Sequence, residues 1–290
     1  MLDEAEKSKL PVAPGELPPF PAVAIKALQV ASSGDGRLRE LHDLVCADPV
    51  FAGEILRVAN SPLYGISARI NSTLQASILL GYERLKKLVL TIGIRVYLAN
   101  ALDIPTLRAC WRHSLACAVV AEDLASASFV AKSEARAYLD KDAAYTAGII
   151  HDLGRLVLAK LMPKQYADLL KGTKSESCNV LARERELFGI DHCQAGRLLV
   201  EAWRLPAEFI EIASGHHDDL CNRPFDALAA VHFSCLMADA LGFQVANSIG
   251  FRSYEELLSG LPEPERQYFC VRGEEYISKV ARRIDLLESL

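Results

Sequence analysis

The sequence predicts an all-α protein, and three observations agree on this fold class. Leu38, Leu41 and Leu44 recur at a three-residue spacing, which keeps one face of a helix apolar. Asp48 followed by Pro49 is typical of a helix start, because aspartate caps exposed N–H groups and proline suits the first helical position. No stretch shows the apolar–polar alternation of a half-buried strand, and no glycine-rich phosphate loop occurs.

The first hundred residues are expected to form a series of short helices. Pro21 opens a run of good helix formers that continues to Leu28. Pro62 stops a later helix, because proline cannot continue the hydrogen-bond ladder. The predicted helices cover residues 21–28, 37–47, 50–59, 73–81 and 83–98.

Helices that carry most of the histidines are expected after a break at residues 100–105. They cover residues 105–127, 139–160, 179–188, 191–203, 206–215 and 225–242, with polar loops at 171–178 and 217–224. A last helix over 274–290 places Tyr276, Val280, Ile284 and Leu287 at helical spacing. This face either packs on the core or mediates homo-oligomer formation. The expected organisation is a tail (1–16), an N-terminal helical part (17–100), a helical core (101–243) and a C-terminal helical extension (244–290).

The composition is that of a soluble globular protein. Hydrophobic residues make up 51% and charged residues 24% of the 290 residues, which argues against disorder. A net charge of -5 gives no sign of a nucleic-acid binder driven by counterion release. Met1 to Leu10 lacks the apolar core of a signal peptide, and no apolar run approaches the ~20 residues of a membrane span. We therefore expect a cytoplasmic protein without membrane or nucleic-acid partners.

Eight cysteines are scattered along the chain, and none belongs to a C-x-x-C pair. A chain of this length does not need disulfides for stability. We expect small buried thiols in a reducing compartment rather than a zinc ribbon or a redox pair. The cysteines are Cys46, Cys110, Cys117, Cys178, Cys193, Cys221, Cys235 and Cys270.

Five of the seven histidines are candidate metal ligands because of their positions in the predicted helices, and two carboxylates join them. His151 and Asp152 are adjacent within an apolar stretch between Gly148 and Gly154, where small residues leave room for another helix or a ligand. Neutral imidazole and carboxylate together suit iron, manganese or zinc better than calcium. The candidate residues are, in chain order, His113, His151, Asp152, His192, His216, His217 and Asp239.

Each residue also has a purely structural interpretation. A lone histidine in an apolar helix is usually a hydrogen-bonded core residue, and Asp239 can simply accept hydrogen bonds from a neighbouring helix. Asp191 before His192 is a good helix N-cap, and a pair of histidines before aspartates is typical of an exposed turn. His42 and His232 are expected to be structural, with a supporting role behind a metal ligand left open for His232. The order of the set, rather than any member, indicates a site.

The order H…HD…H…HH…D resembles the HD superfamily of metal-dependent phosphohydrolases, and specifically its HD-GYP branch. The N-terminal part resembles the HDOD family, a bacterial signalling domain derived from that branch. The resemblance covers roughly residues 17–243 and implies an HD-type helical bundle preceded by a helical subdomain. The matching stretches are Leu17 to Pro21, Asp48 to Pro62, Ile70 to Gly81, Ala147 to Gly154, Glu186 to Gly189, Asp191-His192, Trp203 to Pro206 and His216-His217.

The resemblance implies that the seven candidate residues are metal ligands, in a site of one or two ions. Iron or manganese is favoured, and zinc or magnesium is allowed. Arg155 stands where the family usually has a lysine near the substrate phosphate, a role that arginine can fill bidentately. Two departures matter. No Gly-Tyr-Pro triplet follows His216 and His217, and HDOD domains have commonly lost ligands, so a metal-free protein is also consistent with the resemblance.

Two functions are therefore open. The favoured one is a regulatory module of bacterial signal transduction that binds a protein partner or a small nucleotide-like ligand without turnover. The alternative is a metal-dependent phosphohydrolase that acts on a nucleotide or cyclic dinucleotide, in which metal-bound water attacks phosphorus. A third possibility lies between them, with metal bound only to stabilise the fold.

Overall fold

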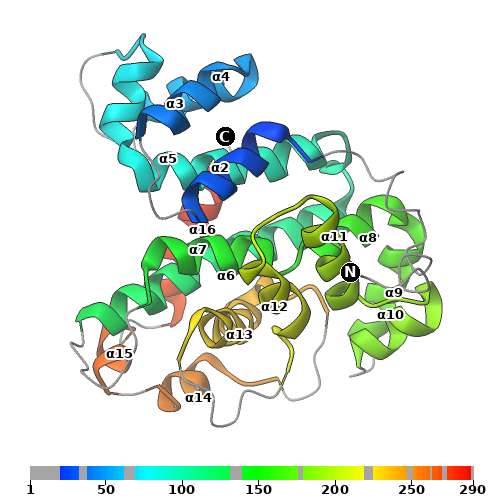
Figure 1. Ribbon diagram of the computed structural model, residues 1–290. Helices are drawn as coiled ribbons and strands as arrows, with labels where there is room; N and C mark the ends of the chain where they lie inside the picture. The colour runs from blue at the N-terminus through cyan, green and yellow to red at the C-terminus, as the bar shows by residue number, and fades with distance from the viewer. Residues whose placement is uncertain are drawn as a thin grey trace. The chain divides into compact units, whose positions relative to one another are not determined.

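All regular structure among the described residues is helical (Figure 1). The computed structural model describes residues 20–32, 38–61, 69–130, 139–175, 179–218, 225–246, 251–261, 263–269 and 273–288. The all-α fold class is confirmed. The chain forms two compact units. The smaller holds Pro18–Ala99 with Trp203–Pro206 and the chain end Leu286–Leu290, and the larger holds Met1–Leu17, Asn100–Ala202 and Ala207–Asp285, including α16 (Gly273–Glu288) up to Asp285. None of the described helices is long and apolar enough to cross a membrane.

The smaller unit contains four helices, and the starts of two of them follow the expected capping rules. The Asp48 side chain accepts hydrogen bonds from the Val50 and Phe51 backbone N–H groups, and Ser72 caps the last helix. Gly81 has a non-helical backbone inside that helix, with φ +72° and ψ 169°, so this element consists of two helical segments that meet at a kink, as the separate helices predicted over 73–81 and 83–98 require. The helices are α2 (Ala22–Ser32), α3 (Leu38–Cys46), α4 (Pro49–Ala59) and α5 (Thr73–Leu98), followed by a short 3-10 turn at Ala99–Ala101.

The larger unit carries every candidate site residue. Long α6 packs along α7 and α13, while α8 and α11 pack against each other. Its elements are α6 (Pro105–Val130), α7 (Lys141–Ile150), α8 (Leu153–Leu161), α9 (Pro163–Ser175), α10 (Val180–Phe188), α11 (His192–Ala202), α12 (Glu208–Gly215), α13 (Ala227–Ala238), a π turn η4 (Asp239–Phe243), α14 (Tyr254–Ser259), α15 (Glu263–Tyr268) and α16 (Gly273–Glu288).

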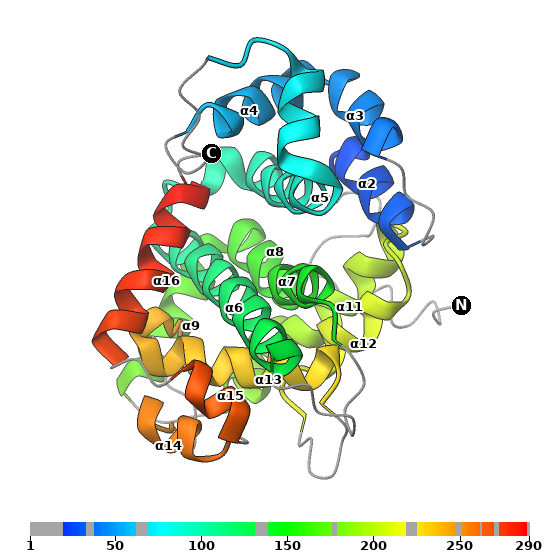
Figure 2. The same ribbon diagram turned by 90° about the vertical axis from the view of Figure 1, so that its left-hand side faces the viewer.

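The C-terminal helix α16 uses its apolar face inside the larger unit. Tyr276, Val280 and Ile284 are buried, and the Tyr276 hydroxyl donates a 3.0 Å hydrogen bond to Asp123 on α6. Arg283 also pairs with Asp123, at 3.1 Å. Figure 2 shows α16 beside α6. These three positions of the face therefore pack on the core of the larger unit, and the oligomeric state stays a prediction.

Several sequence-based element boundaries were wrong. The helix predicted over 139–160 breaks at His151 and Asp152, which cap the end of α7 and the start of α8. Asp239 opens the π turn rather than lying in mid-helix. Helix α9 extends into the stretch 171–175 that was expected to be a loop, and α14 and α15 were not anticipated. Residues 176–178 and 219–224 of the predicted loops lie outside the described residues.

Candidate metal centre

A continuous row of histidine rings runs through the larger unit. Ring centroids are 5.7 Å apart between His113 and His151, 4.9 Å between His151 and His216, and 5.5 Å between His216 and His192. These four side chains come from α6, the end of α7, the end of α12 and the start of α11, and all four are buried. His217 is exposed and continues the row, with its ring 4.3 Å from that of His216.

Backbone carbonyls orient three of these rings. His113 Nδ1 lies 3.1 Å from the Phe243 carbonyl oxygen, and His151 Nδ1 lies 2.6 Å from that of Gly148. His216 Nδ1 similarly lies 3.2 Å from the Ile212 carbonyl oxygen. Because a carbonyl oxygen only accepts, Nδ1 carries a hydrogen in each ring, so it is the Nε2 lone pair that each ring offers to a metal in its neutral form. Metal-binding histidines are held in this way.

Three buried atoms at the centre have no hydrogen-bond partner among the described residues. They are His151 Nε2, His216 Nε2 and Asp152 Oδ1. These three residues each offer a ligand atom within 4.8 Å of the others, and Asp152 Oδ1 lies 3.8 Å from His216 Nε2. Unpaired buried acceptors are costly, and a cation among them would satisfy all three at once. The buried cluster therefore fits a divalent metal.

Arg155 neutralises the other side of the Asp152 carboxylate. Its Nε donates a 2.7 Å hydrogen bond to Asp152 Oδ2, and its Nη2 lies 3.1 Å from His192 Nε2. Burial alone would raise the pKa of Asp152, but Arg155 and the nearby histidines hold that pKa well below its usual range. Burial lowers the pKa of His216 to about 3, with a further contribution from His151. At neutral pH the cluster thus presents a carboxylate and a neutral imidazole.

A buried glutamate that the sequence did not single out anchors His192. Glu184 on α10 accepts hydrogen bonds from the His192 backbone N–H at 2.8 Å and from its Nδ1 at 2.6 Å. The Tyr166 hydroxyl donates to the other carboxylate oxygen at 2.5 Å. Glu184 was missed because charged residues surround it in the sequence, and only its full burial distinguishes it from exposed Glu186.

Replacing Glu184 with glutamine should change how stability depends on acid. Burial raises the pKa of Glu184, but His192 and Arg155 outweigh it and bring the pKa down to about 2. The folded state therefore favours the ionised form. The contribution of ionised Glu184 to the free energy of unfolding is complete above the pKa of glutamate in the unfolded chain, about 4.3, and is lost as pH falls towards about 2. Denaturant unfolding between pH 6 and pH 2.5 should show a steeper loss in wild type than in Glu184→Gln, and parallel curves would contradict this assignment.

Two cysteines join the row beside His113 and His151. Cys117 on α6 and Cys235 on α13 are buried, and their sulfurs lie 3.7 Å apart. The Cys117 sulfur lies 3.4 Å from His113 Nε2. Ligand atoms of His113, Cys117, His151 and Cys235 all lie within 4.8 Å of one another. The four-residue spacing of His113 and Cys117 was a usable signal, since such residues share a helix face.

The remaining predicted residues lie at the edge of the cluster. Asp239 Oδ1 is 3.6 Å from His113 Nδ1, the ring edge that faces away from the cysteines. His217 Nε2 is 3.1 Å from His192 Nε2. His232, expected to be structural, bonds through Nδ1 to the His216 carbonyl oxygen at 2.9 Å and so supports a central residue. The N-terminal His42 bonds Ser77 at 3.0 Å.

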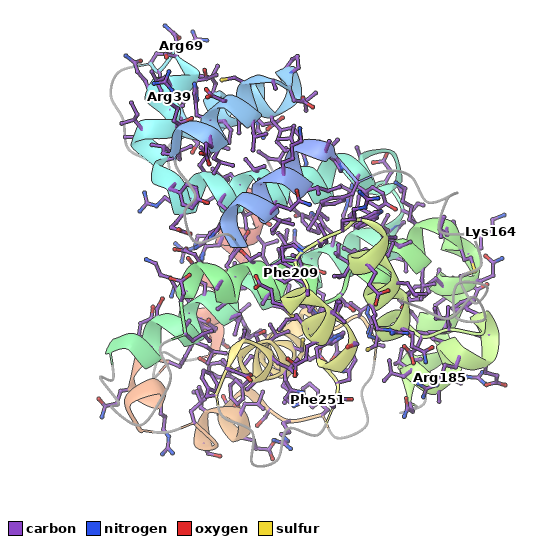
Figure 3. The ribbon with its side chains drawn as sticks, viewed as in Figure 1. Arg39, Arg69, Lys164, Arg185, Phe209 and Phe251 are labelled. Atoms are coloured by element: carbon purple, nitrogen blue, oxygen red, sulfur yellow. The ribbon has the colours of Figure 1, made fainter. Side chains whose placement is uncertain are left out.

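Asp191 serves as a helix cap, one of the structural alternatives. Its Oδ1 accepts a 2.8 Å hydrogen bond from the Gln194 backbone N–H at the start of α11. Its other oxygen pairs at 2.5 Å with Arg185, which is labelled in Figure 3. Asp191 therefore fixes the start of the helix that presents His192.

A pocket of about 240 Å³ opens beside the row. His113, Arg155, His217 and Asp239 contribute its polar lining, and Asn179 to Leu181 and Val245 close other sides. Sites for drug-sized ligands typically occupy about 300–1,000 Å³, so this space suits a small group such as a phosphate with part of its carrier.

Comparison with known proteins agrees with this fold. A family model of the HDOD domain matches residues 17–219. An HDOD domain protein of unknown function from Geobacter sulfurreducens superposes with a TM-score of 0.71, at 22% identity over 94% of this chain and 93% of that one. A candidate signal transduction protein from Marinobacter aquaeolei VT8 gives 0.70 at 21% identity, over 100% of this chain and 61% of that one. A candidate phosphohydrolase from Shewanella amazonensis SB2B superposes with a TM-score of 0.67 at 18% identity, over 98% of this chain and 97% of that one.

These likenesses show the fold and leave the activity open, because all three identities are low. An uncharacterized protein of Treponema pallidum (strain Nichols) is 20% identical over 203 residues, which make up 70% of this chain. The chain spans 38% of that relative's length. The match over residues 17–219 covers Pro18–Ala99 and Trp203–Pro206 of the smaller unit and the histidine row up to His217.

Proposed function

The chain belongs to the HDOD domain family, and we propose that it is a regulatory module of bacterial signal transduction that binds one divalent metal. Its output is the binding of a protein partner or a small nucleotide-like ligand, without turnover. The observation that carries the proposal is that the two oxygens of the Asp152 carboxylate have different surroundings, and we call this a divided carboxylate. One oxygen is unpaired among His151 and His216, whereas the other is held by Arg155 at 2.7 Å.

The divided carboxylate favours one ion over two. A carboxylate that bridges two metals must offer one oxygen to each, and here a guanidinium already occupies the second position. The same guanidinium engages His192 Nε2, which removes another ligand from a second ion. The histidine and carboxylate donors favour iron or manganese at the remaining position, with His151, Asp152 and His216 as the core ligands.

The pocket supports a ligand-binding output. A bound divalent metal would supply a fixed positive charge that attracts phosphate oxygens. His217 is exposed and lines the pocket beside the buried cluster, so it is the histidine that an entering ligand meets first. The pocket volume of about 240 Å³ suits a phosphate group with part of a mononucleotide better than a whole cyclic dinucleotide.

Metal content tests the proposal. We expect one equivalent of iron or manganese in the purified protein. Asp152→Asn should lower this metal content, and added Mn²⁺ should raise the melting temperature of the variant less than that of wild type. Asp218→Asn is a matched control, because Asp218 is an exposed carboxylate two residues from His216. Equal metal content in Asp152→Asn and wild type would exclude this site.

The phosphohydrolase alternative is decided on the same preparations. The metal-loaded protein should release no phosphate or nucleotide from a panel of phosphomonoesters, nucleotides and cyclic dinucleotides. Hydrolysis that disappears in Asp152→Asn would establish the enzyme instead and contradict a module without turnover.

A further inference from the structure

The buried cluster of His113, Cys117, His151 and Cys235 brings together two nitrogens and two sulfurs from α6, the end of α7 and α13. We propose that these four residues form a zinc site of the tetrahedral two-histidine, two-cysteine type. This site shares His151 with the carboxylate site of Asp152 but takes its other three ligands from elsewhere, and it does not rest on the regulatory function proposed above.

The spacing of the donor atoms matches a tetrahedral zinc ion. With Zn–S near 2.3 Å and Zn–N near 2.0–2.1 Å, tetrahedral geometry places two sulfurs about 3.8 Å apart and a sulfur and a nitrogen about 3.6 Å apart. The Cys117 and Cys235 sulfurs lie 3.7 Å apart, and the Cys117 sulfur lies 3.4 Å from His113 Nε2. The sulfur separation is far beyond the ~2.05 Å of a disulfide bond, so the two side chains are thiols.

The surroundings also suit zinc. His113 and His151 both present Nε2 to the cluster, because the Phe243 and Gly148 carbonyl oxygens hold their Nδ1 hydrogens. Two thiolates balance the charge of a divalent ion, so the filled site carries no net charge, which suits its four buried side chains. Thiolate ligands select zinc over manganese or magnesium, which prefer oxygen.

A third overlapping group, His192 with Cys193, His216 and His217, is a weaker candidate. Both nitrogens of His192 are already engaged, Nδ1 by Glu184 at 2.6 Å and Nε2 by Arg155 at 3.1 Å. Cys193 therefore offers a matched control for the two cysteines of the zinc site.

The zinc site and the carboxylate site exclude each other. Both need His151, whose Nδ1 is bound to the Gly148 carbonyl, so only Nε2 is available and it serves one ion at a time. Zinc bound to the cysteines consequently takes a ligand from the carboxylate site. A thiophilic metal such as zinc then fills the site with the cysteines, whereas an oxygen-preferring metal such as manganese fills the adjacent carboxylate site.

Zinc and cobalt binding to the full chain under reducing conditions tests the proposal. Cobalt-loaded wild type should show thiolate-to-cobalt charge-transfer absorption and intense tetrahedral visible bands. In Cys117→Ser and Cys235→Ser this absorption should weaken and zinc affinity should fall by at least ~100-fold, more than the loss typical of an outer-shell change. Cys193→Ser and Asp152→Asn should retain both signals, and Asp152→Asn should lose only Mn²⁺ binding. Zinc should also displace bound Mn²⁺ from wild type.

Two results would overturn the assignment. One is a cobalt spectrum of wild type without thiolate charge transfer, and the other is zinc affinity unchanged in the Cys117→Ser/Cys235→Ser double variant. If the double variant does not fold, X-ray absorption of zinc-loaded wild type decides the question. Two sulfurs near 2.3 Å and two nitrogens near 2.0 Å support the site, whereas a shell of nitrogen and oxygen only refutes it.

Discussion

Gly154→Ala is expected to destabilise the protein by about 3 kcal/mol or more, at the upper end of overpacking effects. A Cβ atom at this position would lie 1.9 Å from the His192 carbonyl oxygen and 2.4 Å from the Gly196 nitrogen. Both contacts are backbone atoms, so no side chain can rotate away. Helices α8 and α11 would have to separate.

Separating these helices also affects the site, because Arg155 lies on α8 and His192 on α11. Asp152, at the start of α8, should also shift relative to His216, so Mn²⁺ binding should weaken together with stability. Denaturant unfolding and Mn²⁺ titration of the variant measure the two effects.

Gly172→Ala serves as the control for Gly154→Ala. Gly172 lies exposed in α9, and an added Cβ there would meet nothing within 4 Å. Alanine is the better helix former, so this change should stabilise by roughly 0.5–1 kcal/mol. Equal stabilities of the two variants would show that α8 and α11 do not approach as closely as described.

Local signals predicted the helices, because capping and apolar spacing act within a few residues. Asp48 caps α4 as expected, and the α5 bend at Gly81 falls where two separate helices were predicted. The break at His151 and Asp152 could not be predicted in this way, because its causes are tertiary. Asp152 faces Arg155 one turn later and the histidines of two other helices.

The order of the histidines predicted the candidate ligands but not how these residues are shared between the carboxylate site and the zinc site. Nothing local pairs Cys117 with Cys235, which are 118 positions apart, and the family pattern contains no cysteine at either place. Glu184 was likewise invisible without the fold. Arg155 was expected near a phosphate, and the structure instead places its guanidinium against Asp152 and His192, so the phosphate role stays a prediction.

Arg155→Met should make the metal-free protein about 3–5 kcal/mol less stable, yet increase its response to metal. Removing one partner of a buried ion pair leaves the other charge uncompensated, here that of Asp152, and buried Glu184 loses the same nearby cation. The same change releases Asp152 Oδ2 and His192 Nε2 as ligands. Mn²⁺ should therefore raise the melting temperature more in the variant than in wild type.

Thermal unfolding with and without Mn²⁺ measures this coupling, and Arg183→Met is its control. Arg183 pairs with Glu186 on the exposed side of α10, with both side chains more than half exposed, so its loss should change stability by at most about 1 kcal/mol and leave the metal response unaltered. An Arg155→Met protein that gains no more from Mn²⁺ than wild type would mean that the guanidinium does not occupy a cation position. The case for a single ion beside Asp152, and with it the main argument against a two-metal phosphohydrolase, would then be withdrawn.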